Sequence, residues 1–194
     1  MNIDFIILAA GKGTRMGGDS PKVLATLAGK PMIQHLIDTV DSFQSSKTSI
    51  VVGYKSNEVV RDLVSQKKLR FVKQKNQLGT AHAVKQALPN IRKNSVAVIL
   101  YGDVPLVKKN TLNRLIKSAS TGKLSLLTFI KEDPTGYGRI IRGSRKNVQK
   151  ITEHKDASSA EKEIREVNSG ILAINASLLQ QFISKIKNNN AAKE

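Results

Sequence analysis

The sequence predicts an α/β protein in which a mostly parallel sheet carries helices on both faces. As far as about residue 124, short apolar runs alternate with segments of helical periodicity. This alternation is typical of parallel strands joined by crossover helices. The unbroken apolar runs suit strands that are buried on both faces. The 194 residues, 40% of them hydrophobic, suffice for one domain with a sizeable core. These observations together indicate a Rossmann-like sheet.

The first half of the chain accounts for the parallel part of this sheet. Buried strands are expected at residues 5–8, 50–52, 69–72 and 96–100. Between them, apolar residues recur three and four positions apart, which predicts helices, the last of them around residues 112–119. Pro31 suits the start of the first helix. Ser56 and Thr80 have side chains that can cap the next two helices.

The character of the sequence changes in the second half. The elements expected there are a strand at 124–130, a hairpin made of 139–142 and 148–152, a strand at 167–174 and a helix from 178 to 186. Ser158 and Glu161 have the spacing of a capping box, which predicts a short helix between the last two strands. These elements indicate a small β-rich insertion. Because no stretch resembles a linker, residues 1–194 are expected to form one domain.

Composition and charge limit the classes of function. The chain has no cysteine, so a disulfide framework and a thiolate metal site are both excluded. Lysine and arginine number 32 against 15 acidic residues, a net charge of +17 that favours anionic partners. Only 4% of the residues are aromatic, which is poor material for stacking bases, so we expect no specific nucleic-acid partner. No apolar run is long enough to span a membrane, and a cytoplasmic protein is expected.

The loop after the first strand is the first candidate site. Its sequence is Leu-Ala-Ala-Gly-Lys-Gly-Thr-Arg-Met at residues 8–16, and Lys22 follows shortly after. Exposed backbone N–H groups and basic side chains are suited to oligophosphates. The loop matches neither the dinucleotide fingerprint, because Met16 replaces the third glycine, nor the Walker A motif, because Lys12 precedes Gly13. From these residues alone, a phosphate loop and an ordinary turn remain open.

Two further segments could complete a nucleotide site. Gln74 and Gln77 could hydrogen-bond a nucleobase, although glutamines in a loop are more often simply solvated. Asp103 follows the predicted strand 96–100, at the edge where open α/β sheets bind ligands. A single carboxylate there suits Mg²⁺ held jointly with phosphate oxygens, but a plain turn at this point is the alternative. The three histidines share no motif spacing, so a histidine metal site or catalytic triad is not expected.

Seven motifs together carry a resemblance to a known family. They are Leu-Ala-Ala-Gly-Lys-Gly-Thr-Arg-Met (8–16), Pro-Lys-Val-Leu (21–24), Gln-Leu-Gly-Thr-Ala-His-Ala (77–83), Tyr-Gly-Asp-Val-Pro-Leu (101–106), Gly-Tyr-Gly-Arg-Ile (136–140), Glu-His-Lys-Asp-Ala (153–157) and Asn-Ser-Gly-Ile (168–171). Over essentially its full length, the chain resembles the sugar-1-phosphate nucleotidylyltransferases. Within them, it is similar to the N-acetylglucosamine-1-phosphate uridylyltransferase domains of bifunctional uridylyltransferase/acetyltransferases.

The resemblance implies an activity. These enzymes join UTP and N-acetylglucosamine 1-phosphate to give UDP-N-acetylglucosamine and pyrophosphate, a precursor step in cell-wall synthesis, with Mg²⁺ as cofactor. By similarity, Arg15, Lys22 and Asp103 would be the catalytic residues, and Asp103 would bind the metal.

The resemblance also implies the substrate contacts. The expected uridine and phosphate contacts are Leu8, Ala9, Ala10, Gly11, Gly13, Lys22, Gln74, Gly79, Thr80, Tyr101, Gly102 and Asp103. The expected contacts with the sugar and its acetamido group are Gly138, Glu153 and Asn168.

The chain departs from the family pattern near residue 194. In the family, an asparagine that is the second metal ligand and a β-helix acetyltransferase domain lie further along, so a truncated domain with an incomplete Mg²⁺ site is expected. Without the β-helix domain we expect a monomer. Three alternatives remain open: a nucleotidylyltransferase for another sugar 1-phosphate, a catalytically weak fragment that binds UDP-sugars, and a nucleic-acid-binding role driven by the net charge of +17.

Overall fold

The computed structural model describes residues 1–11, 20–63 and 69–186. Its first half supplies four strands, β1 (Asn2–Ala9), β4 (Ser46–Val52), β5 (Leu69–Lys73) and β6 (Ser95–Tyr101). The helices between and after them are α1 (Met32–Asp41), α2 (Ser56–Leu63), α3 (Thr80–Ala87) and α4 (Lys109–Ala119). Short elements complete this half: the 3₁₀ helices η2 (Lys22–Leu24) and η3 (Leu88–Asn90), and the strand pair β2 (Thr26–Leu27) and β3 (Lys30–Pro31).

The second half supplies the remaining strands. They are β7 (Ser125–Ile130), β8 (Arg139–Arg142), β9 (Val148–Thr152) and β10 (Glu166–Asn175). Two helices accompany them, α5 (Ser159–Lys162) and α6 (Ala176–Ile183). The predicted hairpin is confirmed, because β8 and β9 pair antiparallel. The predicted capping box is also confirmed, since the Ser158 hydroxyl accepts from the Glu161 N–H while the Glu161 carboxylate accepts from the Ser158 N–H.

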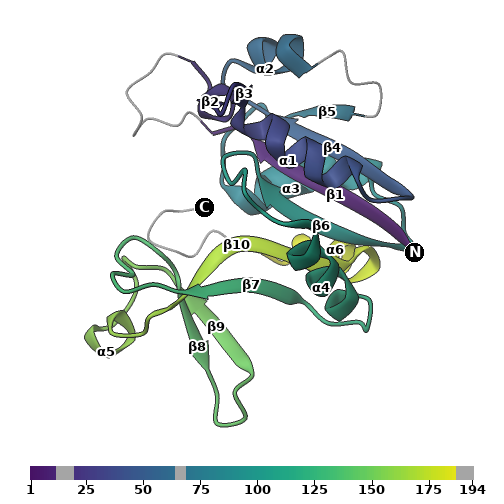
Figure 1. Cartoon of the computed structure of the whole chain (residues 1–194). Helices are drawn as coiled ribbons and strands as arrows, with labels where there is room; N and C mark the ends of the chain where they lie inside the picture. Colours follow the sequence, from purple (N-terminus) through teal and green to yellow (C-terminus); the bar gives the residue numbers. More distant parts are fainter. Residues whose placement is uncertain (12–19, 64–68, 187–194) are drawn as a thin grey trace.

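One sheet runs through both halves, in the order β5-β4-β1-β6-β10-β8-β9, with β7 also paired to β10 (Figure 1). The pairs β5–β4, β4–β1 and β1–β6 are parallel, as predicted for the first half. From β10 onward every pairing is antiparallel, and β10 itself contacts β6, β7 and β8. We call β5, β4, β1 and β6 the parallel half, and β7 to β10 the antiparallel half.

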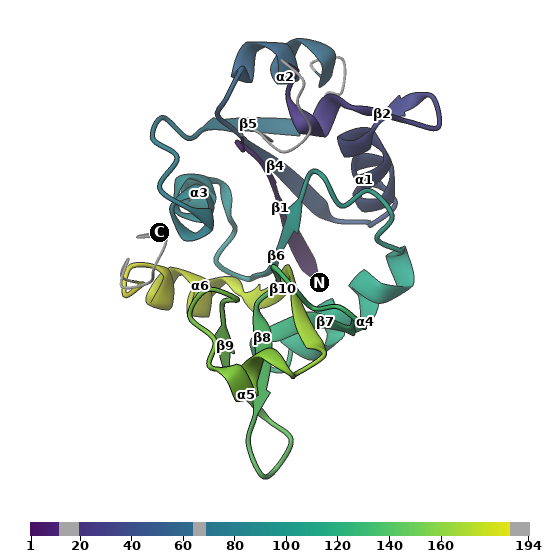
Figure 2. The ribbon, with the colours of Figure 1, turned by 90° about the vertical axis from the view of Figure 1, so that its left-hand side faces the viewer.

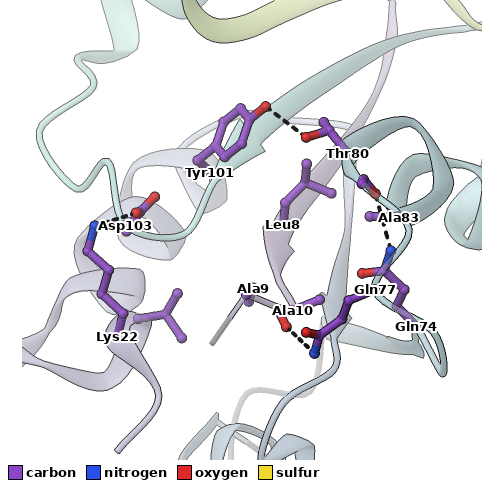
Figure 3. Close-up of a pocket in the computed structure, with 13 residues that line it drawn as sticks. Leu8, Ala9, Ala10, Lys22, Gln74, Gln77, Thr80, Ala83, Tyr101 and Asp103 are labelled. Atoms are coloured by element: carbon purple, nitrogen blue, oxygen red, sulfur yellow. Dashed lines mark hydrogen bonds and ion pairs between the residues drawn. The ribbon is translucent and has the colours of Figure 1, made fainter. Parts of the chain in front are cut away.

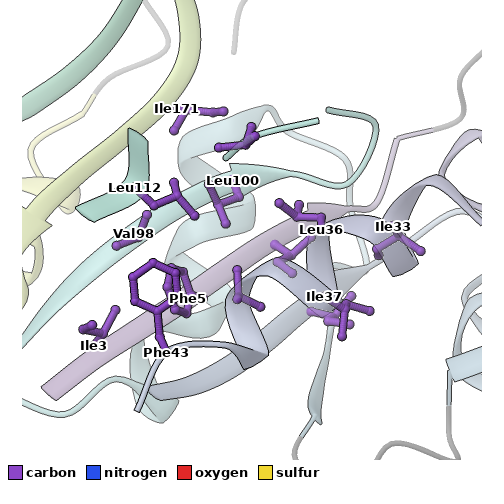
Figure 4. Packing of buried hydrophobic residues seen from close by; sticks show 14 of the residues in the cluster. Ile3, Phe5, Ile33, Leu36, Ile37, Phe43, Val98, Leu100, Leu112 and Ile171 are labelled. Atoms are coloured by element: carbon purple, nitrogen blue, oxygen red, sulfur yellow. The ribbon is translucent and has the colours of Figure 1, made fainter. Parts of the chain in front are cut away.

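Helices cover both faces of the sheet, as predicted (Figure 2). On one face, α1, α2 and α4 pack on alternate residues of β1, including Phe5 and Ile7, around the cluster shown in Figure 4. On the other face, α3 and α6 cover Ile6 and Ile99. Odd and even positions of one strand reach opposite cores because side chains alternate along a strand. The parallel strands are therefore fixed from both sides, and the loops at their carboxyl ends have a firm base.

Two helix starts differ from the prediction. Thr80 was expected to cap α3, but the residue at the N-cap is Gly79, whose φ of 91° is unfavourable for residues with a side chain. Thr80 is the first helical residue, and its hydroxyl faces the Tyr101 hydroxyl instead. Ser56 likewise is the first residue of α2 rather than the residue before it.

Within residues 1–11, 20–63 and 69–186, no helix is both long enough and apolar enough to cross a membrane.

Candidate active site

A cavity of about 540 Å³ opens at the carboxyl ends of β1 and β6 (Figure 3). This is the edge at which open α/β sheets bind ligands, and pockets for small molecules range from roughly 300 to 1,000 Å³. The predicted residues that line it are Leu8, Ala9, Ala10, Gly11, Lys22, Gln74, Gly79, Thr80, Tyr101 and Asp103. Gln77, the second glutamine named as a candidate from the sequence, lines it too, as do Val23 and Ala83. The cavity therefore unites four segments of the sequence, which lie within residues 8–11, 22–23, 74–83 and 101–103.

Opposite charges meet on one side of the cavity. Lys22 begins η2, Asp103 follows β6 closely, and the Lys22 Nζ donates to the Asp103 Oδ2 over 2.8 Å. Their side chains are 35% and 31% exposed. A pair that water can reach contributes only about 1 kcal/mol or less, so a ligand phosphate or a metal ion can replace either partner. This side is suited to phosphates.

The end of β1 is held close to the end of β6. The Gly102 N–H donates to the Leu8 carbonyl over 2.9 Å. A Cβ on Gly102 would lie 2.9 Å from the Val23 Cγ1, so a larger residue would push η2 away. Gly102 is thus buried beneath the cavity and is not one of its lining residues. The predicted residues Lys12, Gly13 and Arg15 lie outside the described part of the chain.

Amide side chains form the opposite side of the cavity. The Gln77 Nε2 donates to the Ala10 carbonyl over 3.0 Å and ties its loop to the end of β1. Gln74 follows β5 and is 4% exposed. Its Nε2 donates to the Gly79 carbonyl over 3.2 Å and lies 2.9 Å from the His82 Nδ1. This side therefore presents fixed amide groups, which suit the hydrogen-bonding edge of a base.

Tyr101 joins the cavity to the antiparallel half. Its hydroxyl lies 3.4 Å from the Thr80 Oγ1. A Cβ on Gly170 would lie 2.5 Å from the Tyr101 ring, so the ring rests directly on that glycine. Burial raises the pKa of the Tyr101 phenol above its usual value, and the carboxylates of Glu153 and Asp103 add to this rise. The phenol is therefore a neutral hydrogen-bonding group near neutral pH.

The three residues predicted to hold the sugar lie together beyond Tyr101. Gly138 precedes β8, Glu153 follows β9, and Asn168 belongs to β10. The Asn168 N–H donates to the Gly138 carbonyl over 2.8 Å, and a Cβ on Gly138 would lie 3.1 Å from the Glu153 Oε1. The Asn168 Oδ1 accepts from the Gly170 N–H over 3.0 Å. They are not lining residues of the cavity, but Gly170 connects them to Tyr101 at its edge.

Sequence reasoning missed the role of Arg139. Arg139 is almost completely buried, with only 1% of its surface exposed. The guanidinium donates to the carbonyls of Tyr137 and Lys162, and one terminal nitrogen lies 3.3 Å from the His154 Nδ1. Arg139 thereby ties the strand after Gly138 to the loop that follows Glu153. Its only signal in the sequence was its place in the Gly-Tyr-Gly-Arg-Ile motif.

Asp103 suits a Mg²⁺ site in which one protein carboxylate acts together with phosphate oxygens and water. Among the described residues, no group of three or more His, Asp or Glu side chains could hold a metal ion. Mg²⁺ commonly takes one or two protein carboxylates, and phosphates and water complete its coordination. Asp103 fits that arrangement when a nucleotide supplies the phosphates. An all-protein metal cage does not fit the described residues.

The chain is similar in sequence to known nucleotidyltransferases. Residues 5–167 match the family model described as MobA-like NTP transferase domain. The chain is 48% identical to the bifunctional protein GlmU of Ruthia magnifica subsp. Calyptogena magnifica and 46% identical to that of Pseudomonas aeruginosa. Each match covers 100% of this chain and 42% of the relative, so the chain spans less than half of those proteins.

A solved structure is similar in fold. The UDP-glucose pyrophosphorylase complexed with UDP-glucose has a TM-score of 0.77 at 16% identity, over 99% of this chain and 83% of the other. At this identity the likeness concerns the fold alone. It agrees with the Rossmann-like, mostly parallel sheet that the sequence predicts.

Proposed function

The chain belongs to the family of MobA-like NTP transferase domains, and on that premise we propose that it transfers a uridylyl group from UTP to N-acetylglucosamine 1-phosphate. The products would be UDP-N-acetylglucosamine and pyrophosphate. The observation that carries the proposal is the cavity in which fixed amides, Lys22 and Asp103 converge at the ends of β1 and β6. The identity of 46–48% to bifunctional proteins named GlmU supports this choice within the family.

The proposed reaction is a direct displacement at phosphorus. An oxygen of the sugar phosphate forms a bond to the α-phosphorus of UTP, while the bond from that phosphorus to the bridging oxygen breaks and its electron pair leaves with pyrophosphate. The second pKa of a phosphate monoester is about 6, so the nucleophile is already anionic near neutral pH and needs no general base. The protein's task is to position two polyanions and to stabilise charge.

The residues of the cavity divide this task. Gln74 and Gly79 would hold uracil, and Thr80 the adjoining ribose. Lys22 would leave Asp103 for the phosphates of UTP, where its ammonium offsets the developing negative charge. Asp103 would hold Mg²⁺ together with phosphate oxygens. The bound ion would supply further charge neutralisation at the phosphates.

The antiparallel half would hold the acceptor sugar. The Glu153 carboxylate lies against Gly138, where a Cβ would crowd it, and it can accept hydrogen bonds from sugar hydroxyls. The Asn168 amide lies next to Gly170 and so close to Tyr101. A sugar held there would present its phosphate toward the cavity that contains the nucleotide. Tyr101 would lie between the two substrates.

Pyrophosphate release tests the proposal. The chain is incubated with UTP, Mg²⁺ and one sugar 1-phosphate at a time, and products are identified by mass spectrometry. We expect UDP-N-acetylglucosamine and an equal amount of pyrophosphate. Faster turnover of glucose 1-phosphate would favour a nucleotidylyltransferase for another sugar. Binding of UDP-N-acetylglucosamine without pyrophosphate release would favour the weak UDP-sugar-binding fragment and contradict the enzyme proposal for this chain.

A further inference from the structure

The main-chain carbonyl of Ala10 accepts two hydrogen bonds. The Gln77 Nε2 donates to it over 3.0 Å, and the Tyr54 N–H donates to it over 3.2 Å. A carbonyl oxygen has two lone pairs, so these two donors use its full capacity. Because a carbonyl can only accept, the Gln77 amide has to present its nitrogen to Ala10. The carbonyl is therefore held by two loops, one that follows β4 and one that precedes α3.

A glycine brings the first of these loops close to Ala10. A Cβ on Gly53 would lie 2.9 Å from the Cβ and from the carbonyl oxygen of Ala10. Any side chain at residue 53 would therefore push the neighbouring Tyr54 N–H away from its acceptor. Ala10 itself is buried, whereas Gln77 is exposed at the cavity and adds its bond from outside the core.

The direction of this carbonyl determines where the next N–H points. In a trans peptide, the C=O and the following N–H point in opposite directions, and none of the described residues has a cis peptide bond. Since the Ala10 carbonyl faces Gln77 and Tyr54, the Gly11 N–H points away from them. Figure 3 shows Gln77 across the cavity from Lys22. Gly11, which lines the cavity, thus has its N–H directed away from the amide side.

A rotated peptide would present the opposite group to a ligand. Its carbonyl carries partial negative charge and would repel an oligophosphate, whereas an N–H group donates to one. We propose that Gln77 is a positioning residue: by holding the Ala10 carbonyl, it keeps the Gly11 N–H available to a phosphate of the bound nucleotide. This inference rests on the proposed function, because it presumes that the phosphates lie between Gly11 and Lys22.

The affinities for UTP and for uridine test the inference. Gln77→Met keeps the approximate length of the side chain but removes its donor. We expect the affinity for UTP, measured by calorimetry, to fall about three- to tenfold, as the loss of one hydrogen bond implies. The affinity for uridine, measured by nuclear magnetic resonance, should stay within about twofold of the wild type. Equal losses for both ligands would assign Gln77 to the base and overturn the inference. So would a wild type that binds uridine as tightly as UTP.

The Gly11 amide proton gives a second, direct readout. The chain has 13 glycines, so isotope labelling of glycine gives a simple amide spectrum in which Gly11→Ala identifies the Gly11 signal. Saturating UTP should move this signal downfield in the wild type, because a hydrogen bond to phosphate is charge-assisted. The shift should be smaller in Gln77→Met. Gly122, in the turn after α4, is the internal reference.

A matched variant separates this effect from the loss of any glutamine. Gln181→Met replaces an exposed glutamine on α6 that does not line the cavity, and it should leave both affinities and the Gly11 shift unchanged. Absence of a Gly11 shift in the UTP-saturated wild type, or an equal shift in Gln77→Met, would overturn the inference. Pyrophosphate release by the wild type tests the proposed function separately.

Discussion

The parallel half of the sheet brings residues to the cavity from the ends of neighbouring strands, whereas the antiparallel half assembles its cluster across strand pairs. Around the cavity, the fixing contacts use main-chain carbonyls, such as those of Leu8, Ala10 and Gly79. Around Gly138 and Glu153, the buried Arg139 makes the connections. Charged pairs also tie this half together, among them Arg142 with Glu166.

This difference predicts that the two halves of the sheet respond to different substitutions and to different changes of pH. Apart from the Lys22–Asp103 pair, these contacts that fix the cavity end on main-chain carbonyls, so they depend on backbone conformation and do not titrate. A cluster held by charged side chains depends on the presence of each charge, and its carboxylate pairs, such as Glu166 with Arg142, also depend on pH. We therefore expect nucleotide binding and sugar binding to be separable by substitutions in the two halves.

The largest effect is expected for Asp103→Ala. Loss of the carboxylate removes the proposed metal contact, and we expect pyrophosphate release to fall roughly 10²- to 10³-fold, as for other preorganised charge-stabilising groups. Asp41→Ala is the matched control, because Asp41 is exposed at the end of α1. Wild-type rates in Asp103→Ala would contradict the assignment of this residue to the metal.

Arg139→Met should affect the antiparallel half selectively. It leaves the carbonyls of Tyr137 and Lys162 without their buried donor, and we expect unfolding free energy to fall by about 2 to 3 kcal/mol. Urea denaturation measures this loss. Affinity for N-acetylglucosamine 1-phosphate should fall while affinity for UTP stays. Arg145→Met, at an exposed position in the turn between β8 and β9, is the control. Equal losses of both affinities would contradict the separation of the two halves.

Gly79→Ala tests the parallel half, because it should weaken the binding of UTP, which Arg139→Met leaves unchanged. At a φ of 91°, a Cβ strains the backbone, and such positions cost about 1 to 3 kcal/mol. We expect UTP to bind more weakly, because the Gly79 carbonyl that holds Gln74 would shift. Titration with UTP measures the effect, and Gly122→Ala, in the turn after α4, is a control with a similar φ of 81°. Unchanged UTP affinity would show that the loop tolerates the strain.

The smallest expected effect is a loss of folding stability when the pH falls and the Glu161 carboxylate takes up a proton. A hydrogen bond from Lys150, followed by one from the Ser158 N–H, lowers the pKa of Glu161 to about 2. The lowered pKa means that the carboxylate stabilises the folded state above pH 4.5 and that this contribution is lost as the pH falls toward 2. Glu161→Gln should therefore lose less stability than the wild type between pH 6 and pH 3, measured by urea denaturation. Equal losses would contradict the role of this carboxylate.

The parallel half could be predicted largely from the sequence. Unbroken apolar runs marked β1 and β6, and parallel strands necessarily bring Ala10 and Asp103 to one edge of the sheet. The start of α3 was misplaced by one residue, because Thr80 is a good cap by type while the backbone conformation at Gly79 is decisive.

The antiparallel half could be predicted only in part. Its strands were visible as apolar runs, but no pattern shows that β10 contacts three other strands. The proximity of Gly138, Glu153 and Asn168 depends on that pairing, so their grouping came from the resemblance alone. The burial of Arg139 could not be predicted either, since arginine is usually exposed.

The late position of β10 in the chain has a consequence during synthesis on the ribosome. β6 pairs with β1 on one side, but its other edge waits for β10, whose last residue is Asn175. At about 5 to 20 residues per second, translation from Tyr101 to Asn175 takes roughly 4 to 15 seconds. Throughout that interval the most apolar strand of the sheet has an unpaired edge, which invites association with other nascent chains. Pairing with β10 therefore protects this edge of β6 only after Asn175 has been made.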